Sequence, residues 1–512
     1  MFYNRKITFS APILYFLREI NKILLSRLTK LRFYGKIYAV YIFRKEVNMK
    51  KVDTNNGVAK RESLGSRLGF ILISAGCAIG IGNVWRFPYI VGRNGGGLFV
   101  LIYLIFLAFM GIPIMTMEFA MGRASRKSPA KLYSELEPKG SKWHIHSYFA
   151  VAGNFLLMMF YTSVAAWMIR YFFYTLRGDF VGLSTDAISS KFDSMISEPW
   201  SMIAVVVGVV VVGFLVCSFG VQKGLEKVTK PMMLLLLVIM VVLAVNSFFL
   251  DGAGEGLSFY LIPSFSKMKD AGVVSVITDA MNQAFFTLSI GIGSMAIFGS
   301  YIGKERSLLG ESVNIAALDT FVAICSGLII FPACFTFDVE VGAGPSLIFE
   351  TLPNVFNQMA GGRIWGALFF VFLTFAAFST VLAVFENIIA CTSDLFGWSK
   401  KKSCLIDGIA LSILSIPCIL GFNAWAGFHP LGGTTNIMDL EDFIVSNVLL
   451  PAGSLIFVIF CTTRYGWGWN KFVAEANEGK GLKVAKWMRP YMTFVLPVLV
   501  LALFVLGIVN YF

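Results

Sequence analysis

Long apolar segments separated by short polar loops make up most of the chain. Eleven of these segments reach at least the roughly 17 residues that a transmembrane helix requires. Their approximate ranges are 67–91, 97–122, 148–176, 200–217, 222–249, 274–301, 311–336, 364–392, 404–421, 441–463 and 486–512. The pattern predicts an all-α integral membrane protein with 11 transmembrane helices.

Lys and Arg residues are concentrated in every second loop. The basic loops lie at 123–147, 223–230, 304–306, 400–402 and 464–486, and the loops between them contain acids and few cations. Cytoplasmic loops of membrane proteins are enriched in Lys and Arg. We therefore expect a multi-pass protein of the plasma (inner) membrane with a cytoplasmic N-terminus. Because the number of spans is odd, the C-terminus is expected outside.

The composition excludes the soluble classes of protein. Of the 512 residues, 57% are hydrophobic and 14% are charged, whereas about 25% of the residues of a soluble domain are charged. The net charge of +13 does not indicate nucleic-acid binding, because residues 1–48 hold ten Lys and Arg against two Glu. The eight Cys lie mostly in apolar runs without a CxxC motif, which favours reduced, buried thiols.

The first 48 residues differ from the rest of the chain. Basic residues are scattered among their aromatic and aliphatic side chains, so no uncharged stretch is long enough to span a bilayer. We interpret 1–48 as a basic extension that is either not native or a dispensable tail, with Met49 as the natural start and 49–66 as a cytoplasmic segment. The alternative is a basic amphipathic helix that lies on anionic lipid.

Two of the predicted spans contain residues that disrupt helices. The first span includes Gly76, Gly80, Gly82, Asn83, Arg86 and Pro88, and the sixth includes Gly291 and Gly293. These spans are matching members of two five-helix units, 67–249 and 250–463, which a loop and span 11 follow at 464–512. Glycine-interrupted helices at matching positions of two repeats indicate the binding site of a secondary transporter. The alternative is close helix packing through Gly76 and Gly80.

Charged side chains inside spans are functional candidates, since each costs about 2.5–3.5 kcal/mol at the bilayer centre. They are Arg86, Glu118, Asp319 and Glu386. Asp319 is typical of a cation ligand, with pairing to a neighbouring helix as the alternative, whereas we interpret Glu118 and Glu386 as structural. The adjacent hydroxyls of Ser379 and Thr380 have the chemistry that Na⁺ prefers, although such hydroxyls often bond only their own backbone.

Three stretches of sequence, taken together, form a motif set that can be compared with known families. They are Gly80-Ile-Gly-Asn-Val-Trp-Arg-Phe-Pro-Tyr89, Phe285-Phe-Thr-Leu-Ser-Ile-Gly-Ile-Gly293 and Phe375-Ala-Ala-Phe-Ser-Thr380. This set resembles the neurotransmitter:sodium symporter family, in particular its bacterial, LeuT-like branch, and the resemblance covers approximately residues 60–512. It implies a LeuT-type inverted five-helix repeat in which helices 1 and 6 are broken.

The resemblance also implies two sodium sites. One would use the carbonyl oxygens of Gly76, Ile79 and Ala376 and the hydroxyls of Ser379 and Thr380. The other would use the carbonyl of Ala78, the side chains of Asn83 and Thr287, and the carboxylate of a bound amino acid. Because substrate and ion would share that carboxylate, each would lower the cost of binding the other.

Asp319 stands where the resemblance departs from the family pattern. The family's asparagine ligand of the sodium that meets the substrate is missing, and Asp319 matches either that ligand or an acid a few residues further on. In both registers it places a fixed negative charge near sodium. In the family such an acid substitutes for a bound chloride, so the resemblance implies chloride independence.

The resemblance further implies a substrate pocket between two gates. The pocket would be formed by Ala78, Gly80, Gly82, Leu157, Tyr161, Phe286, Thr287, Ser289 and Ile292, with Tyr161 and Phe286 as its lid. Arg86 and Asp442 match the outer gate, and Arg61 and Asp394 match the inner gate. Two further departures are Leu64, in place of a tryptophan beside the inner gate, and Cys77 beside the ion sites.

These features lead to one leading hypothesis. We expect a sodium-coupled symporter for a neutral, hydrophobic or aromatic L-amino acid, with Na⁺ as its coupling ion and no other cofactor. Its partners would be the amino acid, Na⁺ and the lipid bilayer, without nucleic acid, and it would be a monomer or weak dimer. The alternative is a sodium-conducting channel or leak pathway on the same fold. No catalytic motif surrounds the three His, which argues against an enzyme.

Overall fold

The computed structural model describes residues 64–338 and 347–509, all within one unit that spans 61–512. In these two ranges the regular elements are helices, apart from an isolated bridge between Arg306 and Lys480. The predicted extension 1–48, most of the segment 49–66, and Arg61 lie outside the described residues. All eight Cys are described, and they are free and buried, as the sequence predicts.

Nine helical runs in the described part of the chain are long and apolar enough to cross a membrane. They are Gly97–Ser125 (α4, η2 and α5), Ile145–Arg177 (α7), Pro199–Ser218 (α9), Val221–Ser247 (η3 and α10), Leu308–Thr336 (α15), Gly362–Phe396 (α17), Lys400–Leu420 (α18 and α19), Ile437–Thr462 (α20, η5 and α21) and Met488–Val509 (α23, η6 and α24). Each of them coincides with a predicted span to within a few residues.

The first and sixth predicted spans have a different form. The first is a pair of helices, α2 (Arg67–Ala78) and the run Gly82–Arg93 (η1 and α3), which meet at 55°. The sixth is divided between α13 (Val273–Thr287) and α14 (Ser294–Tyr301), which are too short to count separately. The described residues therefore contain nine or ten spans by length and composition, and the total of 11 remains a prediction.

Shorter helices connect the spans. They are α6 (Leu132–Leu136), α8 (Thr185–Ser197), α11 (Ala253–Leu261), α12 (Phe265–Ala271), η4 (Leu347–Thr351), α16 (Leu352–Gln358) and α22 (Trp469–Ala476).

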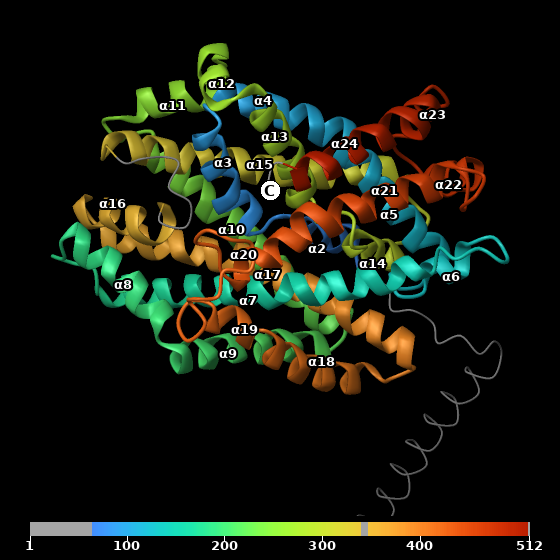
Figure 1. The fold of residues 1–512 in the computed structure, drawn as a ribbon, viewed down its shortest axis with the longest axis horizontal. Helices are drawn as coiled ribbons and strands as arrows, with labels where there is room; N and C mark the ends of the chain where they lie inside the picture. Colours follow the sequence, from blue (N-terminus) through green and yellow to red (C-terminus); the bar gives the residue numbers. More distant parts are fainter. Residues whose placement is uncertain (1–63, 339–346, 510–512) are drawn as a thin grey trace, which may run out of the picture. The chain divides into compact units, whose positions relative to one another are not determined.

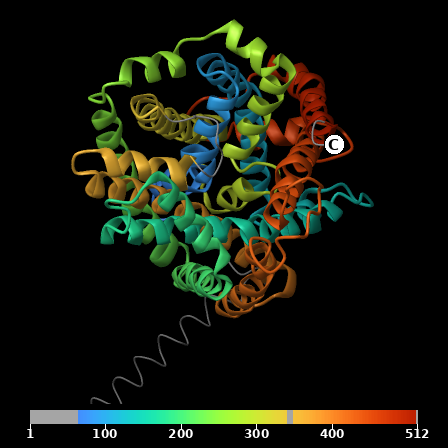
Figure 2. The ribbon, with the colours of Figure 1, turned by 60° about the vertical axis from the view of Figure 1, so that its left-hand side comes forward.

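The broken helices lie inside the bundle. Figures 1 and 2 show α2 and α3 surrounded by other helices, and α17 packs along both α2 and α7. Residues Gly69–Ala78 of α2 are almost all buried, as expected of a helix that is apolar on every side and enclosed by protein. By contrast, α9 and α18 lie at the edge of the bundle and expose apolar side chains such as Val212 and Leu405, which suits contact with lipid.

Glycines bring α5 and α14 into direct backbone contact. A Cβ atom at Gly122 would overlap the carbonyl oxygen of Ala296, and one at Gly299 would overlap that of Phe119. Close approach of this kind is a common way of packing helices in membranes, where the hydrophobic effect does not drive helices together. The α5–α14 contact thereby fixes the second half of the broken sixth segment.

We expect Gly122→Ala to lower the thermal stability of the purified protein, because the added methyl group meets backbone that has no room to move. Overpacking of this kind costs about 1–3 kcal/mol. Gly208→Ala is the matched control, since Gly208 is exposed on α9 and a Cβ atom there meets nothing. Unfolding temperatures in detergent measure the difference, and equal values for the two variants would contradict this packing.

Candidate functional site

Two interruptions of helical structure face each other at the centre of the bundle. The helix α2 ends at Ala78, and Ile79 has an extended backbone before Gly82 begins η1. Between α13 and α14, Ser289, Gly291 and Gly293 have positive φ angles of 51°, 105° and 77°. These left-handed conformations explain the two glycines of this stretch. Both interruptions occur at the glycines that the sequence analysis singled out.

The first interruption is surrounded by oxygen atoms. The Thr380 hydroxyl lies 3.2 Å from the carbonyl oxygen of Gly76 and 3.3 Å from that of Ile79. The Ser379 hydroxyl lies 3.3 Å from the carbonyl oxygen of Ile79 and 2.9 Å from that of Ala376. The five oxygens expected to form one sodium site thus converge in a buried location. We call this set the Thr380 cluster.

A second group of polar atoms surrounds Asp319. Its carboxylate accepts hydrogen bonds from the Asn83 amide at 2.8 Å and from the Thr287 hydroxyl at 3.1 Å. The side-chain oxygen of Asn83 accepts a bond of 3.1 Å from the backbone N–H of Gly80. Asn83, Thr287 and Asp319 are fully buried. We call these three residues the Asp319 cluster, which brings together the three side chains expected at the other sodium site.

A small cavity lies beside the Thr380 cluster. It is lined by Cys77, Ala78, Gly80, Gly82, Leu157, Tyr161, Phe286, Ser289, Ile292, Thr380 and Leu450. Of the expected substrate residues, all except Thr287 line it. Its volume of about 20 Å³ leaves room for little more than one water molecule. The pocket is therefore closed in this conformation and has to expand around a larger molecule.

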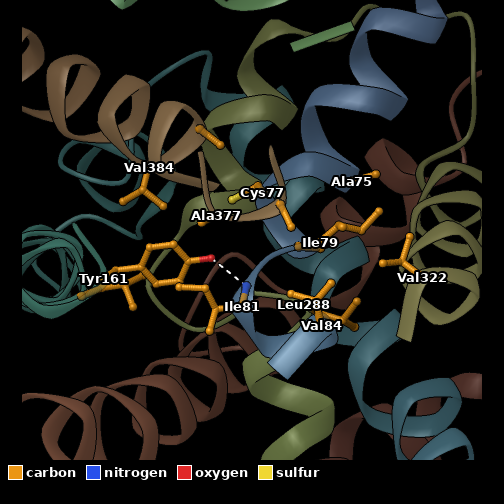
Figure 3. Close-up of a cluster of buried hydrophobic side chains, with 14 of the residues drawn as sticks. Ala75, Cys77, Ile79, Ile81, Val84, Tyr161, Leu288, Val322, Ala377 and Val384 are labelled. Carbon is orange, nitrogen blue, oxygen red and sulfur yellow. Dashed lines mark hydrogen bonds between the residues drawn. The ribbon is translucent and has the colours of Figure 1, made fainter. Parts of the chain in front are cut away.

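Tyr161 orients one wall of the cavity. Its hydroxyl accepts a hydrogen bond of 3.0 Å from the backbone N–H of Ile81, at the break between α2 and η1 (Figure 3). Gly80 is required beside it, since a Cβ atom there would overlap the Tyr161 hydroxyl and approach Thr380. The side chain thus bonds backbone that the interrupted helix leaves without an intrahelical partner.

The sequence analysis did not identify Leu450 as a pocket residue. Leu450 lies at the start of α21, in an apolar run that contains no distinctive motif. It reaches the cavity because Gly291 packs directly on the Leu450 backbone, and Gly453 packs on Gly291. Leu450 can therefore be recognised as a pocket residue only from these tertiary contacts of Gly291 with α21.

The expected outer-gate residues form an ion pair next to Phe286, a residue that lines the cavity. Arg86 and Asp442 approach to 3.6 Å, and the Ser446 hydroxyl bridges them by accepting from Arg86 at 3.2 Å and donating to Asp442 at 2.7 Å. The Arg86 guanidinium also lies 4.2 Å from the centre of the Phe286 ring. A cation over an aromatic face is attracted to it, so the pair and the pocket wall support each other.

The other charged candidates have partners elsewhere. Asp394 accepts a bond of 2.8 Å from the backbone N–H of Ser128, while its expected partner Arg61 lies outside the described residues. Glu118 accepts bonds from the backbone N–H groups of Gly291 and Met295, around the start of α14.

Glu386 has two partners. It accepts bonds from the Tyr301 hydroxyl at 2.9 Å and from Lys400 at 2.8 Å. Glu118 and Glu386 therefore join neighbouring helices, which agrees with the structural interpretation of both.

Comparison with known proteins connects this geometry to a family. The profile described as the sodium:neurotransmitter symporter family matches residues 61–182 and 179–512. A sodium-dependent transporter of Bacillus subtilis strain 168, YhdH, which is itself uncharacterized, is 32% identical over 450 residues, or 87% of this chain and 98% of that protein. An uncharacterized sodium-dependent transporter of Haemophilus influenzae is 31% identical over 465 residues, or 88% and 99% of the two chains.

A solved structure is also similar. The crystal structure of MhsT in complex with L-phenylalanine superposes with a TM-score of 0.79 at 36% identity. The match covers 87% of this chain and 100% of that one.

The convergence of oxygens at the Thr380 cluster predicts stabilisation by sodium. A ligand that binds only the folded state at about 100 times its Kd adds about 2.7 kcal/mol. We expect sodium, compared with an organic cation, to raise the unfolding temperature of the wild type, and Thr380→Val to lose most of that rise. Thr374→Val is the matched control, because Thr374 lies on the same helix and its hydroxyl has no partner in the described structure. The same sodium response in both variants would contradict cation binding at this cluster.

Proposed function

Since this chain belongs to the sodium:neurotransmitter symporter family, we propose that it imports a neutral, hydrophobic or aromatic L-amino acid together with Na⁺ by alternating access. The family and the similar proteins described above are transporters, so the chain is a membrane transporter and not an enzyme. One observation carries the rest of the proposal: the cavity is lined by Thr380 and by Gly80, whose backbone N–H bonds Asn83 of the Asp319 cluster.

The cavity meets the Thr380 cluster directly and the Asp319 cluster through Gly80, and these contacts are the basis for coupling. Thr380 both lines the cavity and contacts the carbonyls of Gly76 and Ile79. Gly80 lines the cavity and donates to Asn83 of the Asp319 cluster. We assign one Na⁺ to each cluster, with the carbonyl of Ala78 and the substrate carboxylate completing the second. A ligand that contacts both ions favours their binding and is favoured by them.

The broken first helix suits a substrate carboxylate. Residues between Ala78 and Gly82 leave backbone N–H groups outside the regular helical pattern, and the N-terminus of η1 follows them directly. Helix N-termini attract anions through their free N–H groups and their dipole. In our proposal the carboxylate meets these groups and the Tyr161 hydroxyl, which lies beside Ile81 in Figure 3.

The wall of the cavity favours an apolar substrate side chain. Leu157, Phe286, Ile292 and Leu450 contribute aliphatic and aromatic surface, and none of the residues that line the cavity is Lys, Arg, Asp or Glu. A charged substrate side chain would therefore lack a partner at membrane depth, which is costly. The complex of the similar protein MhsT with L-phenylalanine agrees with an aromatic or hydrophobic substrate.

Asp319 supports independence from chloride. Its carboxylate contacts both Asn83 and Thr287, so a fixed negative charge is already present beside the proposed ion. An opposite charge within a few ångströms stabilises a buried cation strongly in a medium of low dielectric constant. A bound chloride is then not required to balance the charge. We also assign Asp319 the role of a direct ligand of that ion, because its carboxylate contacts the two other side chains of the proposed site.

Alternating access requires a gate on each side of the pocket. The Arg86–Asp442 pair is formed and contacts the cavity wall at Phe286 while the cavity is closed, which corresponds to a shut outer gate. We assign the inner gate to Arg61 and Asp394, and the two repeats to 67–249 and 250–463, with 464–512 outside them. In this arrangement the N-terminus is cytoplasmic and the C-terminus is outside. We propose that the protein is a monomer or a weak dimer, and that each subunit contains a complete site.

The central experiment is uptake of labelled L-amino acids into proteoliposomes, with an imposed sodium gradient and with gluconate in place of chloride. We expect gradient-driven accumulation of an apolar or aromatic amino acid that persists without chloride. Sodium leakage with no accumulation would instead favour a channel. Accumulation that stops without chloride would retain the symporter and contradict the role of Asp319.

The charge of Asp319 is tested by Asp319→Asn, which keeps the side-chain shape. Losing the carboxylate is expected to raise the sodium concentration for half-maximal uptake by about tenfold or more, equivalent to about 1.4 kcal/mol. Asp407→Asn is the control, because Asp407 is also a buried acid in a span, but it bonds Thr392, away from the site. Unchanged sodium dependence in folded Asp319→Asn would refute this assignment.

A further inference from the structure

A buried acid that has not yet been assigned a role lies directly beside the outer gate. Glu441 precedes the gate residue Asp442 on α20, and its relative exposure is 3%. The helix α20 packs against α7 and α19. Glu441 is part of none of the contacts that form the gate, the cavity or the two oxygen clusters.

Both oxygens of the Glu441 carboxyl group are buried, and within the described residues neither has an N–H or O–H donor as a hydrogen-bond partner. The Cys418 thiol of α19 lies beside it, and Ser163 of α7 lies beside Cys418. The Ser163 hydroxyl is likewise buried without a partner in the described part of the chain. By contrast, Asp442 has Arg86 and Ser446 as partners. We call Glu441, Cys418 and Ser163 the Glu441 cluster.

The charges around Glu441 disfavour an anion there. On its own helix, Asp439 and Asp442 are both acidic, and the cation Arg86 is engaged with Asp442. The groups that face it from α7 and α19 are a hydroxyl and a thiol, neither of which carries positive charge. Burying an ionised carboxylate without a partner is among the most costly events in a protein interior. The cluster therefore needs a positive ligand whenever α20 is packed in place.

A proton fits this position better than a metal ion does. Hard cations such as Na⁺ require several oxygen ligands, whereas the cluster offers one carboxyl group, one hydroxyl and a thiol. No group of three or more His, Cys, Asp or Glu suited to a metal ion occurs among the described residues. A proton requires only one carboxylate oxygen and leaves a neutral acid that fits the site.

We propose that Glu441 is a proton-binding site coupled to the outer gate. When α20 is packed against α7 and α19 and the Arg86–Asp442 pair is closed, Glu441 holds a proton. When the gate opens, water reaches the carboxyl group, the O–H bond breaks, and the proton passes to the external medium. Closing the gate takes up one proton from outside. The inference rests on the proposed gating role of the Arg86–Asp442 pair.

The direction of the pH effect follows from proton counting. The closed state holds one more proton than the open state, so a substrate that closes the gate binds together with a proton. By linkage, acid then strengthens substrate binding, with a limit of about tenfold per pH unit for one proton. Above the pH at which closed Glu441 can keep its proton, the closed gate loses stability and substrate affinity falls.

Equilibrium binding of L-phenylalanine to the full chain in nanodiscs, in saturating sodium, tests this coupling from about pH 5 to about pH 8. The Kd of the wild type is expected to rise with pH by up to about tenfold per unit. Glu441→Gln carries a permanently neutral side chain of similar shape, and its Kd should match the acid value of the wild type at every pH. Glu255→Gln is the control, since Glu255 is exposed on α11, and it should follow the wild type.

An infrared measurement separates this inference from the proposed function, because it needs no transport. Protonated carboxyl groups have a C=O stretch that ionised carboxylates lack, and the wild type should show such a band that Glu441→Gln specifically removes. A missing band, or a Glu441→Gln variant that keeps the wild-type pH slope, overturns the proton site. A folded Glu441→Gln protein that binds no substrate at any pH overturns it as well. Absent sodium-dependent binding together with an intact band contradicts the proposed function alone.

Discussion

The structure depends on finding hydrogen-bond partners for the backbone N–H and C=O groups that two broken helices leave unpaired inside the bundle. Lipid offers no hydrogen bonds, so irregular backbone at this depth persists only where protein groups or bound ions replace them. Here the hydroxyls of Ser379 and Thr380 approach the freed carbonyls, and the Tyr161 hydroxyl accepts from the freed N–H of Ile81. These polar side chains come from α7 and α17, the helices that pack beside the break. The same groups that make the interruption tolerable therefore form the site.

Around this centre each buried charge has a distinct environment. Asp319 is held by Asn83 and Thr287, Glu118 by backbone N–H groups at the start of α14, and Glu386 by Tyr301 and Lys400. Each of these acids thus joins two or more helices. Glu441 is the contrasting case, since in the described structure its oxygens have no N–H or O–H donor as a partner. Asp319, Glu118 and Glu386 therefore hold helices together. In our proposal, the protonation state of Glu441 instead depends on whether α20 is packed against its neighbours.

The features that could be read from sequence are those with a local cause. Glycines at Gly80 and Gly291 mark the interruptions because only they accept the required backbone or close approach, and hydroxyl pairs such as Ser379 and Thr380 carry recognisable chemistry. Positions defined by contact between distant segments could not be found in this way. Leu450 reaches the cavity through Gly291, and Glu441 is isolated only because α7 and α19 cover it. Likewise, the apolar run located the sixth span and its glycines marked the interruption, but they did not give the ends of its two helices at Thr287 and Ser294.

The double position of Thr380 has a consequence for how the substrate range can evolve. Its hydroxyl belongs to the Thr380 cluster, the proposed sodium site, while the same residue forms part of the cavity wall. If this cluster binds sodium as proposed, a mutation of Thr380 alters ion binding and pocket shape at once, so selection for a new substrate at this residue also changes the sodium coupling. Leu157 and Ile292 line the cavity and belong to neither cluster. In the proposed transporter, substrate preference can therefore diversify through these aliphatic positions, while Thr380 is constrained by its contacts to the carbonyl oxygens of Gly76 and Ile79.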